Sequence, residues 1–140
     1  PFMIYVVTET GIYNYQPNIL PAYTGNPNTD RVGLPIISYL QKLEKGDYRG
    51  DIAQICDNSN LQSAPLIIIP ILNLSRPREN DPEWLWYYEA GASSHNVLLE
   101  AAAWDLSANF YHVSDTEGLC NILDLDSTQY LPLTVIPVGK

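Results

Sequence analysis

Residues 89–103 read EAGASSHNVLLEAAA, and this stretch decides how the fold is interpreted. From Val97 onward it is an ordinary good helix former, whereas the half around Gly91 consists almost entirely of small residues. A glycine in a helix interior costs about 1 kcal/mol relative to alanine. Close approach of another backbone, a bound ligand or a partner chain would each offset that cost.

The pattern predicts a long helix over about residues 83–105 that contains this stretch. One row of its residues recurs at spacings of four, three, four and three positions: Tyr88, Ala92, His95, Leu99 and Ala102. That spacing keeps one side of the helix facing a single partner.

Strands and shorter helices are predicted on both sides of the long helix. The strands cover residues 3–8, 12–16, 66–74, 108–113 and 131–139, and the helices 34–43 (weakly), 46–57 and 116–125. Residues 17–33 and 75–83 are rich in turn-forming residues and are predicted to be loops. The apolar run at 66–74 is typical of a central strand buried on both faces, in which Pro70 indicates a bulge or a non-pairing position. Asp47 or Asp51 is expected to cap the helix that follows Gly46. This order favours a mixed sheet with helices on both faces.

Length and charge restrict the class of protein. The 140 residues predict one domain, and the net charge of −9 with seven Lys plus Arg argues against a nucleic-acid surface. No run reaches the roughly 18 apolar residues of a membrane helix, and no secretory signal is present, so a cytoplasmic location is expected. Cys56 and Cys120 are interpreted as reduced, buried thiols, with a disulfide as the alternative.

No catalytic or metal-binding constellation stands out in the sequence. The two histidines have no acidic partners at metal-ligand spacing, so no metal is expected, and the catalytic residues stay unassigned. Ser93, Ser94 and His95 could suggest a nucleophile and a base, but adjacent helical residues point in different directions. His95 is therefore interpreted as a core or interface residue, and Glu89 as a solvated one.

Five segments taken together resemble the C-terminal two-thirds of the nitroreductase superfamily, closest to the branch of flavin dehydrogenases of thiazole and oxazole peptide synthesis. They are IYVV (4–7), GIYNYQP (11–17), SAPLIII (63–69), YYEAGASSHNVLLEAAAWDL (87–106) and LPLTVIPVGK (131–140). The resemblance covers the whole chain in the right order, and the order is more specific than any one segment.

The resemblance implies an α+β fold, a nitroreductase-like three-layer α-β-α sandwich with a mixed central sheet. It also implies a homodimer that binds FMN at the subunit interface, with the Glu-Ala-Gly helix in the centre of that interface. The small residues around Gly91 would then allow two helices to approach closely.

The departures from the family are as informative. The family's Arg-Arg-Ser-x-Arg element and its Pro-Ser-x-Gly loop have no counterpart, so residues 1–140 are expected to be one domain that lacks the N-terminal segment. The start PFMIYVV then belongs to a fragment, a processed chain or a chain whose front has been removed. The family's Gly-Leu-Gly is replaced by Asp105-Leu106-Ser107. The Lys-Tyr pair of the azoline dehydrogenases is missing between Arg76 and Glu89, so that substrate chemistry is not expected.

Four positions are carried over as flavin contacts. Asn58 matches an Asn or Gln that contacts the ring or ribitol, and Lys140 matches a basic residue near the phosphate. Tyr111 and His112 lie where the family's chain passes the redox-active edge of the ring. Without the flavin, Asn58 and Lys140 would be solvated polar residues and Tyr111 a core aromatic residue.

The resulting hypothesis is an FMN-dependent oxidoreductase that passes a hydride from NAD(P)H to a small electrophilic acceptor by a ping-pong mechanism. The alternative is a catalytically degenerate dimer or complex subunit that keeps the fold and acts as a binding or scaffold module.

Overall fold

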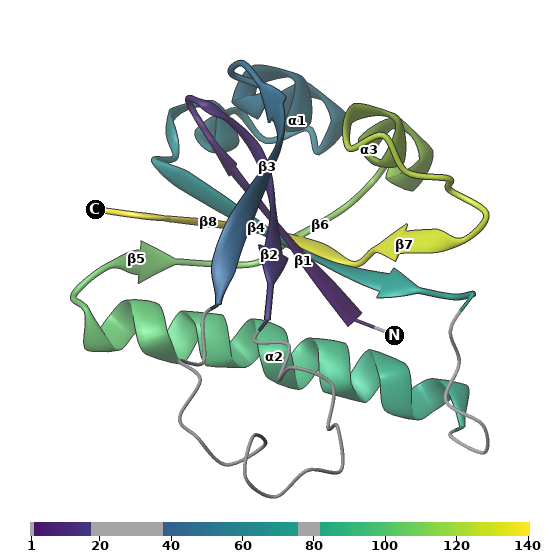
Figure 1. The fold of residues 1–140 in the computed structure, drawn as a ribbon. Helices are drawn as coiled ribbons and strands as arrows, with labels where there is room; N and C mark the ends of the chain where they lie inside the picture. The colour runs from purple at the N-terminus through teal and green to yellow at the C-terminus, as the bar shows by residue number, and fades with distance from the viewer. Residues whose placement is uncertain (1, 18–37, 76–81) are drawn as a thin grey trace, which may run out of the picture.

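The computed structural model describes residues 2–17, 38–75 and 82–140. These residues form one sheet of eight strands, three α-helices and a short 3-10 helix (Figure 1). The strands are β1 (Phe2–Thr8), β2 (Gly11–Gln16), β3 (Tyr39–Lys45), β4 (Leu66–Asn73), β5 (Ser107–Ala108), β6 (Tyr111–His112), β7 (Tyr130–Pro132) and β8 (Thr134–Gly139). The helices are α1 (Arg49–Ile55), η1 (Ser59–Ser63), α2 (Glu83–Ala103) and α3 (Thr116–Ile122). None of the described helices is both long and apolar enough to cross a membrane.

The elements form three layers, as the α-β-α expectation requires. Helices α1 and α3 lie on one face of the sheet, and α2 crosses the other face (Figure 1). The strand order is β3-β2-β1-β4-β8-β5, with β7 also paired to β4 and β6 to β8. The sheet differs from the expectation in one respect: every pairing in the described residues is antiparallel rather than mixed. Antiparallel neighbours can be joined by a tight turn, as β1 and β2 are between Thr8 and Gly11.

Strand β4 is central and largely buried, as its apolar run predicted. It pairs with β1 along one edge and with β8 and then β7 along the other. The register with β1 runs through Pro70 without a shift, so no bulge is present on that edge. On the other edge, pairing with β8 ends at Ile68 and pairing with β7 begins at Ile71. Pro70, which has no N–H to donate, therefore lies where the neighbouring strand changes.

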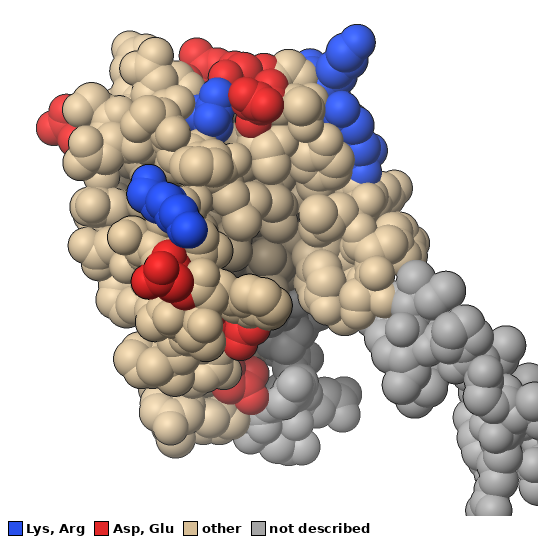
Figure 2. All heavy atoms as spheres, turned by 90° about the vertical axis from the view of Figure 1, so that its left-hand side faces the viewer, with Lys and Arg blue, Asp and Glu red and all other residues tan. Residues whose placement is uncertain are grey.

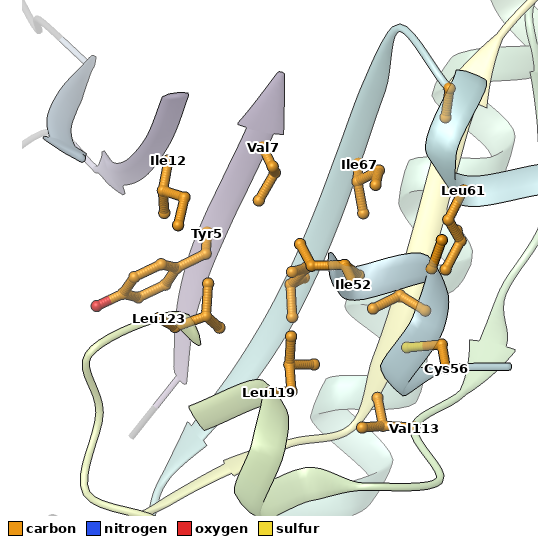
Figure 3. Close-up of a cluster of buried hydrophobic side chains, with 14 of the residues drawn as sticks. Tyr5, Val7, Ile12, Ile52, Cys56, Leu61, Ile67, Val113, Leu119 and Leu123 are labelled. Atoms are coloured by element: carbon orange, nitrogen blue, oxygen red, sulfur yellow. The ribbon is translucent and has the colours of Figure 1, made fainter. Parts of the chain in front are cut away.

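The larger core lies between the sheet and helices α1 and α3. Side chains of β1, β2 and β4 meet Ile52 from α1 and Leu119 from α3, both with 0 % exposure (Figure 3). A smaller core lies under α2, where Ala101 packs with Ile136 and Val138. The two faces of the sheet are therefore held by different helices.

Three boundaries differ from the sequence-based expectation. The weak helix at 34–43 is wrong from residue 39 onward, because Tyr39–Lys45 form a strand beside β2; residues 34–37 lie outside the described residues. The expected strand at 131–139 is divided into β7 and β8 at Leu133, where the register against β4 shifts by one residue and the Leu133 N–H donates to the Pro70 carbonyl (3.2 Å). The expected strand at 108–113 is likewise divided into β5 and β6.

Neither aspartate caps α1. Tyr48 is the N-cap residue and makes no side-chain capping hydrogen bond. The Asp47 carboxylate instead accepts hydrogen bonds from the Arg49 backbone and side chain, and Asp51 lies in the first turn. The Asp47 carboxylate is thus engaged with Arg49, through both its guanidinium and its backbone N–H at the start of α1.

Both cysteines are free and buried, as expected. Burial raises the pKa of the Cys56 thiol to about 11 and also raises the pKa of Cys120. In the unfolded chain a cysteine ionises near pH 8.5, so the folded chain keeps its proton to a higher pH. The protonated Cys56 thiol therefore contributes fully to the free energy of unfolding below about pH 8.5. This contribution is lost as the pH rises toward 11, because the unfolded chain releases its proton first.

We expect this linkage to be visible in denaturant titrations at pH 8 and pH 10. The free energy of unfolding of the parent chain should fall between these two pH values, and it should fall less in Cys56→Ala. An identical fall in both proteins would show that Cys56 does not contribute to the pH dependence.

Candidate functional site

One cavity lies beside the C-terminal end of β8. It has a volume of about 310 Å3, and we call it the C-terminal cavity. Its lining is Asn60, Ser63, Ala64, Pro65, Ser107, Ala108, Asn109, Tyr111, Pro137, Val138, Gly139 and Lys140. Three separate segments of the sequence therefore meet there: the end of η1, the β5–β6 region and the end of the chain.

Strand pairing holds these segments together. Residues of β5 pair with the end of β8, with Ser107 opposite Gly139 and Ala108 opposite Val138. On the other edge of β8, Val138 is opposite Leu66, the first residue of β4. The end of β8 thus has a neighbour on each side, and β5, β6 and β8 contribute to the lining of the cavity.

Two of the four expected flavin contacts lie in this cavity. Tyr111 and Lys140 both line it, although 29 positions separate them in the sequence. Lys140 is exposed, and Tyr111 is half-buried on β6. The apolar part of the lining includes Pro65, Pro137 and Val138, and Lys140 is its one cation.

The other two expected contacts lie elsewhere. His112 is exposed and is not part of the lining. It follows Tyr111 directly on β6, and successive side chains of a strand point to opposite faces, so the two residues do not face the same cavity. Alternation along a strand was a signal already present in the sequence.

Asn58 lines a different cavity, which lies between α1 and η1. Gln54 of α1 and Gln62 of η1 are also part of its lining. Its side chain caps η1 by accepting a hydrogen bond from the Asn60 N–H (3.1 Å). Asn60, two positions further along, lines the C-terminal cavity, as does Ser63. Sequence reasoning missed Asn60; its only signal was the second asparagine in DNSN (57–60).

The cations of the described residues are scattered. Arg49 forms an ion pair with Asp47 (2.7 Å), and the Lys42 ammonium lies 5.4 Å from the centre of the Tyr13 ring. Figure 2 likewise shows separate blue residues, with no continuous basic patch, on the described part of the face at the C-terminal end. An anion in the C-terminal cavity would therefore meet Lys140 as its nearest cation in the lining.

Gly139 lies against the ring of Pro65. A Cβ atom built on Gly139 would be 2.6 Å from Pro65 Cδ and 2.9 Å from Pro65 Cγ. Both residues line the C-terminal cavity, so this close contact fixes the spacing between the end of β8 and the start of β4. Only glycine allows that spacing without a shift of the proline ring.

We expect Gly139→Ala to destabilise the chain by about 1–3 kcal/mol, the usual cost of overpacking. Gly50→Ala is the matched control, because a Cβ there would meet only Gln62 Nε2 at 4.0 Å. Denaturant unfolding of both variants checks this, and a Gly139→Ala variant as stable as the control would show that the proline ring moves freely.

Helix α2 presents its small residues to two different surroundings. Ala90, Ser94 and Ala101 are buried on the sheet side, and the Ser94 hydroxyl donates to the Ala90 carbonyl (2.9 Å). The row expected to face a single partner, which includes Tyr88 (68 %) and Leu99 (56 %), is exposed, so no described element of the chain covers it. A Cβ on Gly91 would meet nothing within 4 Å. Nothing within the described chain therefore requires glycine at residue 91.

Solved structures with the same arrangement identify the fold. A protein from Ralstonia eutropha JMP134 assigned to the nitroreductases superimposes with a TM-score of 0.69 at 20% identity, over 99% of this chain and 57% of that one. The fold is that of the nitroreductases. A protein from Anabaena variabilis with the same assignment gives 0.63 at 22% identity, over 99% of this chain and 27% of that one.

A third solved structure with this nitroreductase-like fold is a chain of the Escherichia coli microcin synthetase McbBCD complex, determined with truncated pro-MccB17 bound. Its TM-score is 0.72 at 12% identity, over the whole of this chain and 52% of that one. No protein-family model and no curated protein matches the sequence. The chain spans between about a quarter and three-fifths of the length of these three structures.

Proposed function

We propose that the chain is part of an FMN-dependent oxidoreductase of the nitroreductase type. In this proposal, NAD(P)H is the donor and a small electrophilic molecule is the acceptor, in a ping-pong sequence in the cytoplasm. The observation that carries the proposal is the C-terminal cavity, where Tyr111 and Lys140 meet in a chain with the nitroreductase fold. When bound, the flavin would supply the hydride-transfer chemistry, which explains why no acid–base constellation is needed.

The chemistry of the lining fits part of the cofactor. Pro65, Pro137 and Val138 offer an apolar surface to a ring system, and the Lys140 ammonium can pair with a phosphate. The volume of about 310 Å3 lies at the lower end of ligand pockets, which range from about 300 to 1,000 Å3. The described residues of one chain would therefore hold a portion of FMN.

In this assignment each residue has a positioning or binding role. Tyr111 would limit the cavity beside the ring, Asn60 would offer its amide, and Lys140 would bind the phosphate. Asn58 would act through η1, because its side chain caps that turn. No catalytic proton donor is assigned to this chain.

We further propose that two copies associate through α2. Exposed aromatic and aliphatic side chains follow this helix: Trp84, Tyr87, Tyr88 and Leu99. Contiguous exposed apolar surface marks interaction sites. A second copy would cover this surface and would explain the tolerance for Gly91 in the middle of the helix.

The alternative is a binding or scaffold subunit without flavin chemistry. It is favoured by the scarcity of cations, since Lys140 is the one cation of the cavity lining. The fold also occurs in a chain of a multi-subunit complex. The two hypotheses differ in whether the protein binds flavin at all.

An absorption spectrum of the purified protein, with and without added FMN, tests the proposed function. We expect little copurified flavin and weak but saturable binding on titration, followed by bleaching of the flavin band when NADH or NADPH is added without oxygen. Absence of saturable binding would favour the scaffold alternative.

A further inference from the structure

Arg49 connects α1 to one wall of the C-terminal cavity. Its Nη1 donates to the Ala64 carbonyl (2.9 Å), and its side chain is 14% exposed. Ala64 and Pro65 belong to the cavity lining, whereas Arg49 does not. The guanidinium thus lies behind the wall and touches it through a single carbonyl.

A carboxylate holds the same guanidinium from the other side. Asp47 Oδ1 accepts from Arg49 Nε (2.8 Å) and Asp47 Oδ2 accepts from Arg49 Nη2 (2.7 Å). This two-bond fork fixes the plane of the guanidinium. The pKa of the Asp47 carboxyl is lowered, chiefly by its hydrogen bond from Arg49.

Two hydrogen bonds tie the wall segment 59–65 to α1, in addition to the packing of Leu61 and Ala64 in the core beside Ile52. At its beginning, the Asn58 N–H donates to the Ala53 carbonyl (2.9 Å). At its end, the Arg49 bond to Ala64 is the attachment, and Pro65 follows immediately with its ring against Gly139. Loss of Arg49 would therefore loosen the end of the segment, where core packing of Ala64 alone would remain, and leave the hydrogen bond at its beginning in place.

We propose that Arg49, oriented by Asp47, is a positioning residue of the cofactor cavity, which sets the distance between the wall segment 59–65 and the Gly139–Lys140 edge. The inference rests on the proposed flavin-binding function. It adds a residue that would touch neither the flavin nor a substrate, and that the pattern of the sequence marked only as part of a helix start.

The sharpest test uses a substitution whose charge effect and positioning effect have opposite signs. Asp47→Asn makes the chain less negative, which by itself would leave the affinity for the FMN dianion unchanged or raise it. If Asp47 orients Arg49, the same change should weaken FMN binding, by about tenfold for one charge-assisted hydrogen bond. Asp51→Asn is the matched control, since it makes the same charge change on α1 without touching Arg49.

The measurements are the FMN dissociation constant and the position of the visible band of bound flavin in the full chain. We expect Asp47→Asn and Arg49→Met to weaken binding and to shift the band, because the ring would meet a displaced wall. Asp51→Asn should have the same FMN dissociation constant and the same band position as the parent chain. Affinity and band position unchanged or improved in Asp47→Asn would overturn the proposal, as would equal effects from Asp51→Asn.

Hydrogen exchange separates this inference from the proposed function. Amides of residues 59–66 should lose protection in Arg49→Met while those of α3 keep theirs, whether or not flavin is present. Unchanged protection of 59–66 would overturn the role of Arg49 even in a protein that binds FMN. A parent chain that does not bind FMN would instead overturn the proposed function and, with it, the assignment of Arg49 to a cofactor cavity.

Discussion

Gly91→Leu is expected to separate the two copies of the proposed dimer without harming the fold of either copy. A Cβ on Gly91 meets nothing within 4 Å in the chain, so leucine has room there. Leucine also removes the helix penalty of glycine, which is worth about 0.8–1 kcal/mol. In the proposed dimer interface, where two α2 helices would approach closely, the leucine side chain would hold the two backbones apart.

The two effects can be measured separately. Light scattering should show the mass of one copy for Gly91→Leu at concentrations where the parent is a dimer, with the dissociation constant raised about 100-fold for an overpacking cost near 3 kcal/mol. Gly91→Ala is the control, because it restores helix propensity with one methyl group and should keep the dimer. An unchanged dimer mass for Gly91→Leu would place the interface elsewhere on the chain.

The sequence predicted the elements whose signal is a long run of apolar residues. β4 and α2 were located closely because an uninterrupted buried run and a 3.6-residue period have few other interpretations. β3 was mistaken for a weak helix because all seven of its residues are exposed, so no burial pattern marks it as a strand. Its conformation comes from pairing with β2, which is a tertiary effect.

The candidate site was half predictable for similar reasons. Lys140 and Tyr111 were located from motifs, and the pairing of β8 with β5 and β6 brings their segments together. Asn58 was carried over from the family resemblance, and nothing in DNSN shows that a 3-10 turn begins there and brings Asn60 to the cavity. The proposed role of Arg49 could not be read from spacing, since it rests on a hydrogen bond to Ala64 across 15 positions. The exposure of the α2 row that includes Tyr88 and Leu99 could not be read either, because periodicity does not say which of two faces a sheet will cover.

Lys140→Ala is expected to have a large effect on the affinity for FMN. Lys140 is the cation of the cavity lining, and the net charge of −9 opposes an anion at long range. A hydrogen bond to a charged group contributes about 1.5–3 kcal/mol, so its loss should raise the dissociation constant by about 10- to 150-fold. Asn58→Ala should have a smaller effect, because Asn58 caps η1 from outside the cavity.

Riboflavin, which lacks the phosphate, supplies the decisive comparison. If Lys140 pairs with the phosphate, Lys140→Ala should weaken FMN binding strongly and leave riboflavin binding unchanged. Lys42→Ala removes the same charge from β3, on the opposite edge of the sheet from β5, and should change FMN affinity by less than about twofold. Fluorescence titrations of FMN and of riboflavin into the parent, Lys140→Ala and Lys42→Ala proteins give the six dissociation constants that are needed. Tight FMN binding that Lys140→Ala does not weaken would mean that other groups bind the phosphate, because screened charge at a distance cannot replace a direct contact.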